Sequence, residues 1–156
     1  MSIIYKKGSL FDAPKGSLLV HACNARGVWG TGIAVEFKKR FPESFTFYHE
    51  FCEQEGKNLL GITILCPEEN DYAVGCLISS DGYGKFKDVP EKILYNTRIA
   101  IPCILKENRP IHSNMFNSGL FNVPWEDTEK VLNEVMEEFR YKNDWTVWQP
   151  KEITNE

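Results

Sequence analysis

Hydrophobic positions in the first quarter of the chain describe a buried strand followed by an amphipathic helix. Residues 18–23 form an apolar run with almost no polar alternation, which is typical of a strand buried on both faces. Further on, Ile33, Phe37 and Phe41 recur at intervals of four residues, so they share one stripe of a helix. Pro42 should end that helix. The pattern therefore predicts a strand, a loop and a helix in direct succession.

The rest of the chain continues the alternation of strands and helices. Periodicity predicts strands at residues 3–7, 61–66, 72–78, 110–116 and 145–149, and helices at 43–55, 89–106 and about 124–141. The strands at 61–66 and 72–78 should form a hairpin, and Pro102 should kink or end the helix that contains it. This order indicates one α/β domain over residues 1–150 with a mixed sheet, followed by a frayed tail at 151–156.

Composition agrees with a single globular domain. The chain has 156 residues, of which 42% are hydrophobic and 26% charged, and these proportions are usual for globular proteins. No stretch approaches the roughly 20 apolar residues of a membrane span, and the first residues lack the layout of a signal peptide. We therefore expect a cytoplasmic protein with no membrane partner.

Charge and cysteine content exclude several classes of site. The net charge of −4 gives no electrostatic footprint for general nucleic-acid binding. Residues 38–40 are basic, and they form either a solvated helix face or one wall of a local basic groove. The cysteines are odd in number and scattered, without a C-x-x-C pair, which argues against disulfides and zinc and favours a reducing compartment. We expect no metal and no cofactor.

The loop at residues 24–32 has the composition of an anion site. Its glycines would let main-chain N–H groups approach a phosphate, and the following helix dipole favours negative charge there. A purely structural turn is the alternative, because no Walker lysine follows and the spacing departs from G-x-G-x-x-G. A second strand-to-helix loop, at 117–125, is also rich in Gly, Ser and Asn. If the two loops meet over one edge of the sheet, they make a two-walled cleft.

Several segments in this order resemble the macrodomain family. The chain reads VHACN followed by WGTGIA, then NSGLFNVP in the second loop and KGSLF near the start. The resemblance is closest to the yeast-type ADP-ribose 1''-phosphate phosphatases, and it extends to the macrodomain enzymes that remove ADP-ribose from acidic side chains or DNA bases. It implies a three-layer α/β/α sandwich with a mixed, mostly parallel six-stranded sheet, and a cleft for ADP-ribose.

The resemblance also implies roles for individual residues. Asn24 would bind the distal ribose, which Trp29 and Phe121 would flank. Macrodomains commonly carry an aspartate where Ser9 stands here, so adenine would be recognised less selectively or through the backbone of Ser9 and Leu10. Trp148 either stacks on the base or belongs to the core. Two asparagines are further candidates: Asn117 would contact the ligand, and Asn122 would either cap the last helix or contact the ligand. The main-chain N–H groups of two runs would bind the diphosphate: Gly30, Thr31, Gly32 and Ile33, and Ser118, Gly119, Leu120 and Phe121.

Three residues are candidates for the chemistry at the distal ribose. His21 is either a hydrogen-bonded core histidine or a general acid–base group that orients Asn24 or a water molecule. Arg26 is either an exposed loop residue or a bidentate clamp for a terminal phosphate. Asp81 is the acid in the polar loop at 79–87. Our hypothesis is metal-free hydrolysis, in which Asn24 and His21 place a water molecule and Arg26 holds the departing phosphate.

The family implies three functions that the sequence leaves open. The first is removal of the phosphate from ADP-ribose 1''-phosphate, a by-product of tRNA splicing. The second is release of ADP-ribose from modified protein or nucleic acid. A lysine used for the second function has no counterpart here, although Lys85 and Lys87 lie in the corresponding loop. The third is non-catalytic binding of ADP-ribose. In each case the partner is a small ADP-ribose derivative or group, and we expect a monomer.

Overall fold

The computed structural model describes residues 2–151, and its centre is one six-stranded sheet. The strands lie in the order β1-β6-β5-β2-β4-β3, and only the pair of β3 and β4 is antiparallel. Their bounds are Ser2–Lys7 (β1), Leu18–Asn24 (β2), Thr63–Leu65 (β3), Ala73–Ser80 (β4), Ile111–Ser113 (β5) and Asp144–Gln149 (β6). The predicted mixed, mostly parallel six-stranded sheet is therefore confirmed.

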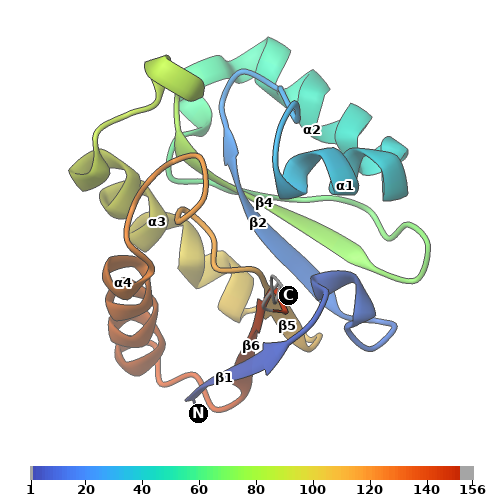
Figure 1. The fold of residues 1–156 in the computed structure, drawn as a ribbon, viewed down its shortest axis with the longest axis vertical. Helices are drawn as coiled ribbons and strands as arrows, with labels where there is room; N and C mark the ends of the chain where they lie inside the picture. Colours follow the sequence, from blue (N-terminus) through green and yellow to red (C-terminus); the bar gives the residue numbers. More distant parts are fainter. Residues whose placement is uncertain (1, 152–156) are drawn as a thin grey trace, which may run out of the picture.

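Helices cover both faces of this sheet and complete three layers (Figure 1). One layer holds α1 (Ile33–Arg40) and α2 (Pro42–Glu55), and the other holds α3 (Pro90–Leu105) and α4 (Trp125–Glu138). Successive residues of a strand face opposite layers. Leu19 and Cys23 of β2 thus pack under α1 and α2, while Leu18 and Val20 pack under α3 and α4. This is why β2 carries apolar residues without alternation.

The predicted order of elements is confirmed, with differences at their ends. Pro42 begins α2 as well as ending α1, because the first turn of a helix needs no N–H from proline. Pro102 does not end α3, which continues to Leu105. Ser79 and Ser80, predicted as loop, are the last residues of β4. Within residues 2–151, no helix is long and apolar enough to cross a bilayer.

Candidate active site

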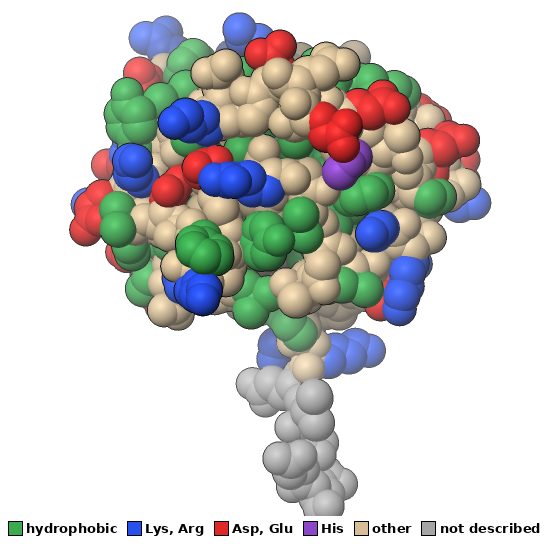
Figure 2. Space-filling model, turned by 90° about the horizontal axis from the view of Figure 1, so that it is seen from above, with side chains coloured by type: hydrophobic (Ala, Val, Ile, Leu, Met, Phe, Trp, Pro, Cys, Tyr) green, Lys and Arg blue, Asp and Glu red, His purple; other side chains and the backbone are tan. Residues whose placement is uncertain are grey.

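The parallel strands all end at one edge of the sheet, and two loops meet there. The loop at residues 25–32 follows β2, and the loop at 114–124 follows β5, which is paired with β2. A Cβ added to Gly32 would lie 3.8 Å from Leu120 Cδ1, so the two loops lie side by side. Figure 2 looks down on this side of the molecule, where acidic, basic and hydrophobic side chains are interspersed. The predicted convergence of the two loops is confirmed.

The side chain of Asn24 organises the first loop. Its Oδ1 accepts hydrogen bonds from the main-chain N–H groups of Arg26 (3.0 Å) and Val28 (3.3 Å). Its Nδ2 donates to the carbonyl of Val28 at 2.8 Å. Asparagine is suited to this task because its amide copies the donor and acceptor of a peptide group. The amide of Asn24 is thus engaged within the loop, and its contact with the distal ribose stays a prediction.

Two side chains from α2 brace the same loop and were missed at the sequence level. The hydroxyl of Tyr48 donates to the carbonyl of Asn24 at 2.6 Å and lies 3.1 Å from its Oδ1. His49 Nδ1 lies 2.9 Å from the carbonyl of Gly27, a contact that raises the pKa of His49. A Cβ at Gly27 would come within 2.8 Å of that ring nitrogen. Helical periodicity identified α2 itself but gave no sign of these polar contacts.

Removing the Tyr48 hydroxyl should loosen this support. Tyr48 is fully buried, so Tyr48→Phe deletes a hydrogen bond that water cannot replace. We expect the free energy of unfolding to fall by about 1–2 kcal/mol, measured by urea denaturation. Tyr95→Phe is the control, because Tyr95 is exposed and should change stability little. Equal stability of the two variants would show that the hydroxyl does not support the loop.

The end of the first loop presents unpaired main-chain N–H groups. Among the described residues, the N–H groups of Gly30, Thr31, Gly32 and Ile33 have no hydrogen-bond acceptor. Gly30, Thr31 and Gly32 are exposed, and Ile33 opens α1. Gly32 has φ 61° and ψ −145°, a conformation that is open essentially to glycine alone. This arrangement, with the helix dipole behind it, is suited to an anion.

The second loop presents a similar set of donors. Within the described chain, the N–H groups of Gly119, Leu120 and Phe121 also lack acceptors, whereas that of Ser118 reaches the carbonyl of Met115 at 3.4 Å. Both Gly119 and Leu120 are exposed. The Ser118 hydroxyl also donates to Met115. Three of the four predicted donors in this loop are therefore available.

Left-handed asparagines stand at both ends of that run. Asn117 has φ 68° and Asn122 has φ 57°, and asparagine tolerates this region better than most residues. The Asn117 side chain is buried and faces inward, where its Oδ1 accepts from Ser79. Asn122 is exposed, and it does not cap α4, which begins after Pro124. The helix-cap alternative for Asn122 is therefore wrong.

A third loop joins the edge through an ion pair. Arg26 and Asp81 form two parallel contacts, Nε to Oδ1 and Nη2 to Oδ2, each at 3.2 Å. Arg26 belongs to the first loop, and Asp81 follows β4, so the pair bridges two loops. The Arg26 side chain is 61% exposed and that of Asp81 26%. Both residues singled out from sequence are therefore brought together, paired with each other.

Comparisons with known proteins agree with this geometry. Residues 20–132 match the model of the Macro domain. The chain belongs to the macrodomain family. It is 38% identical to an ADP-ribose 1''-phosphate phosphatase of Meyerozyma guilliermondii, over 83% of this chain and 91% of that protein. It is 37% identical to one of Candida albicans, over 85% of this chain and 92% of that one.

Solved structures have the same fold. The macrodomain of Mycobacterium tuberculosis DarG superposes with a TM-score of 0.71 at 23% identity, covering 93% of this chain and 96% of that one. Thermosipho africanus DarTG, solved in complex with ADP-ribose, superposes with a TM-score of 0.73 at 17% identity, covering 98% of this chain and 43% of that one. At these identities, the likeness shows the macrodomain fold.

Two predicted ligand-facing rings of this macrodomain lie in its core. His21 is fully buried and stacks on Phe37 with ring centroids 3.8 Å apart. Trp29 is 2% exposed and stacks on Tyr48, with a centroid distance of 5.0 Å. The expectation that Trp29 flanks the ribose is therefore wrong for its ring in this structure. The burial of His21 matches the core alternative, so we give it no direct part in proton transfer.

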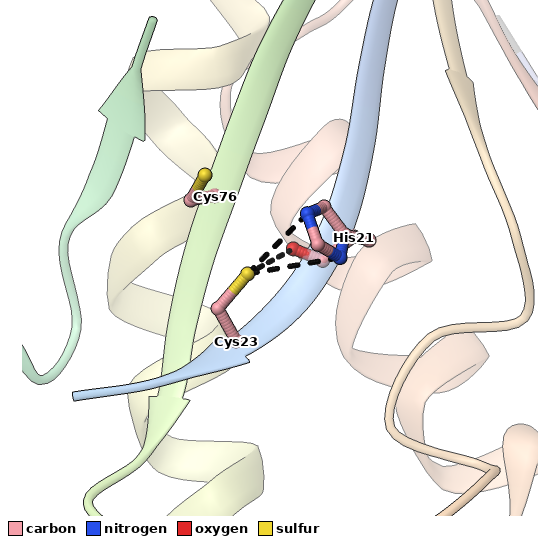
Figure 3. Close-up of side chains that lie close together, drawn as sticks. All are labelled: His21, Cys23 and Cys76. Carbon is pink, nitrogen blue, oxygen red and sulfur yellow. Dashed lines mark hydrogen bonds between the residues drawn. The ribbon is translucent and has the colours of Figure 1, made fainter. Parts of the chain in front are cut away.

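Beside His21 lie two buried cysteines, Cys23 and Cys76, and the three side chains come within 4.8 Å of one another (Figure 3). Cys23 Sγ is 3.7 Å from Nδ1 and 3.5 Å from Nε2 of His21. Because the two distances are nearly equal, the sulfur does not lie along the lone pair of either ring nitrogen. A metal shared by His21 and Cys23 would have to lie along one of those lone pairs. Burial raises the pKa of Cys76 well above its ordinary value, whereas contacts with Cys76 and His21 outweigh burial at Cys23 and lower its pKa to about 6. The cluster therefore packs as part of the core.

The predicted adenine-side residues lie where β1 and β6 end. Ser9 caps a single 3-10 turn, accepting from the N–H of Phe11 at 3.1 Å, and Leu10 is buried. The indole N–H of Trp148 donates to Nδ1 of His112 at 2.9 Å, and the Trp148 ring is half-buried. Base stacking by Trp148 stays a prediction.

The contact between Trp148 and His112 predicts a loss of stability in acid. Burial, and then the charge of Lys6, lower the pKa of His112 below its ordinary value, and Nδ1 must stay unprotonated to accept from Trp148. Because the folded-state pKa is the lower one, this contribution is complete above about pH 6.5 and is lost as the pH falls below that value. Urea denaturation at pH 7 and pH 5 should show a larger loss in the wild type than in His112→Asn. An equal loss would contradict the assignment.

Proposed function

We propose that this macrodomain hydrolyses ADP-ribose 1''-phosphate to ADP-ribose and inorganic phosphate. The observation that carries the proposal is the meeting, at Gly32 and Leu120, of two loops with exposed and unpaired main-chain N–H groups. Two neighbouring sets of donors suit the two phosphates of one diphosphate. Relatives that are 37–38% identical over most of the chain carry the name of this phosphatase.

The bound diphosphate would fix the position of the distal ribose. Asn24 ends β2 beneath the first loop, and its amide sets the course of that loop. Arg26, two residues further on, offers a guanidinium for the 1''-phosphate. Water attacks phosphorus, the bond between phosphorus and the C1'' oxygen breaks, and that oxygen takes up a proton. In water labelled with oxygen-18, the label should appear in the phosphate; label in the ribose would contradict attack at phosphorus.

Calorimetry and a phosphate-release assay test the proposal together. We expect ADP-ribose to bind and ADP-ribose 1''-phosphate to release phosphate. Release of ADP-ribose from a modified protein or DNA, without phosphate release, would assign the protein to the ADP-ribosyl hydrolases. Binding without either activity would identify a reader.

We also propose a cellular setting. The protein would act in the cytoplasm, as a monomer, on a by-product of tRNA splicing. Five cysteines stay free in the described residues, and free thiols are usual in a reducing compartment. Gel filtration with light scattering would test the monomer, and microscopy of a tagged chain would test the location.

A further inference from the structure

Arg26 and Asp81 are held so that their charged groups face each other at the edge where β2 and β4 end. The main-chain N–H of Arg26 donates to Oδ1 of Asn24 at 3.0 Å, which ties its backbone to the end of β2. The main chain of Asp81 is fixed on both sides: its N–H donates to Asp88 at 2.8 Å, and its carbonyl accepts from Ala25 at 3.1 Å. Only the side chains of the pair are therefore free to exchange partners.

The ion pair itself is weakly held compared with its backbone supports. Its contacts are 3.2 Å long, and 61% of the Arg26 side chain is exposed. An exposed ion pair contributes little stability because water and salt compete with it. A phosphate dianion offers more charge and more acceptor oxygens than a carboxylate, so it competes well for the same guanidinium.

We propose that the 1''-phosphate displaces Asp81 from Arg26, and that the released carboxylate of Asp81 accepts the proton of the attacking water. This inference rests on the proposed function and names the group that activates water. Before substrate binds, the pair neutralises both side chains. A ligand without the terminal phosphate has nothing to exchange with Asp81, so the pair also distinguishes ADP-ribose 1''-phosphate from ADP-ribose.

The step is balanced without an added reactant. Asp81 takes one proton from water as the oxygen of water bonds to phosphorus. The bond between phosphorus and the C1'' oxygen breaks with its electron pair left on that oxygen, which then receives the proton from Asp81. Arg26 stays bound to the phosphate until release and then returns to Asp81.

Asp81→Asn is the direct test, because it keeps the shape and removes the charge. We expect kcat to fall by about 100-fold or more, which is the usual loss when a general base is removed. KM for ADP-ribose 1''-phosphate should fall, since Arg26 no longer has a competing partner. The Kd of ADP-ribose, measured by calorimetry, should change less than about twofold because ADP-ribose does not engage Arg26. A kcat within threefold of the wild type would overturn the proposal.

Arg26→Gln gives a second test that does not depend on the first variant folding. We expect kcat/KM to fall by roughly 100-fold through loss of the bidentate phosphate contact, again with little change in the Kd of ADP-ribose. Inorganic phosphate should bind to the complex of wild type with ADP-ribose and not to that of the variant. If the affinities for ADP-ribose and for phosphate fell equally and the melting temperature also fell, the ion pair would serve only to hold the two loops together.

Glu134→Gln is the matched control. Glu134 pairs with Arg98 in another exposed contact, between α3 and α4. The substitution Glu134→Gln removes a carboxylate charge at a site distant from both loops. Kinetics and binding should therefore stay at wild-type values. If the wild type itself releases no phosphate, the proposed function fails; if the wild type is active and Asp81→Asn remains equally active, only the present inference fails.

Discussion

Gly32→Val is expected to weaken ADP-ribose binding by at least tenfold and up to about 100-fold. A side chain at φ 61° and ψ −145° costs about 1–3 kcal/mol of strain. The backbone can relieve that strain only by turning one of the two peptides that flank Gly32, which carry the unpaired N–H groups of Gly32 and Ile33. Steric exclusion is a smaller factor, since a Cβ there would meet Leu120 at an ordinary 3.8 Å. Calorimetry with ADP-ribose measures the loss.

Gly56→Val separates binding from stability. Gly56 follows α2 with φ 50° and ψ −131°, nearly the conformation of Gly32, and a Cβ there would meet nothing within 4 Å. Both variants should lose similar stability in urea denaturation, but only Gly32→Val should lose affinity. If Gly32→Val binds ADP-ribose as the wild type does, the first loop is not part of the diphosphate site.

Asn117→Ala should cause the largest loss of stability among the variants considered. The buried amide of Asn117 accepts from Ser79 at 2.8 Å and donates to Thr97 at 3.0 Å and Thr128 at 3.4 Å. Alanine would leave the three hydroxyl groups without this hydrogen-bond partner. It would also put a Cβ on a residue whose backbone φ is 68°. We expect the free energy of unfolding to fall by about 3 kcal/mol.

Asn117→Gly divides that loss into two parts. Glycine removes the same hydrogen bonds and tolerates φ 68°, so its loss should be about 1–2 kcal/mol smaller than that of alanine. Urea denaturation of both variants measures the difference. Equal losses would mean that the backbone conformation costs nothing, and wild-type stability of both would mean that the buried network does not hold the second loop.

Prediction from sequence succeeded for the elements and for the two loops. Residues 18–23 were identified as a central strand because a strand covered on both faces must be apolar on both. The two loops were identified because glycines let main-chain N–H groups approach an anion and because both loops are rich in Gly, Ser and Asn. These signals are local, so a single sequence carries them.

Prediction of side-chain roles succeeded less well, for a geometric reason. His21 and Trp29 stand in the right segment, but their rings turn into the layer under α1 and α2. Alternation places His21 on the same face as Leu19 and Cys23 without telling how closely a helix covers that face. Tyr48 contacts Asn24, and Arg26 pairs with Asp81, across long separations in the chain. Spacing in the sequence does not predict contacts of this kind.

The sequence by itself determined the order of strands and helices and the position of two donor-rich turns, because hydrophobic periodicity and backbone restriction act over a few neighbouring residues. Only the tertiary structure decided that these turns lie side by side, that the amides of Asn24 and Asn117 hold them in place, and that Arg26 faces Asp81. Those contacts depend on how the strands are ordered in the sheet and which helices cover each face. Packing of the whole chain sets that arrangement.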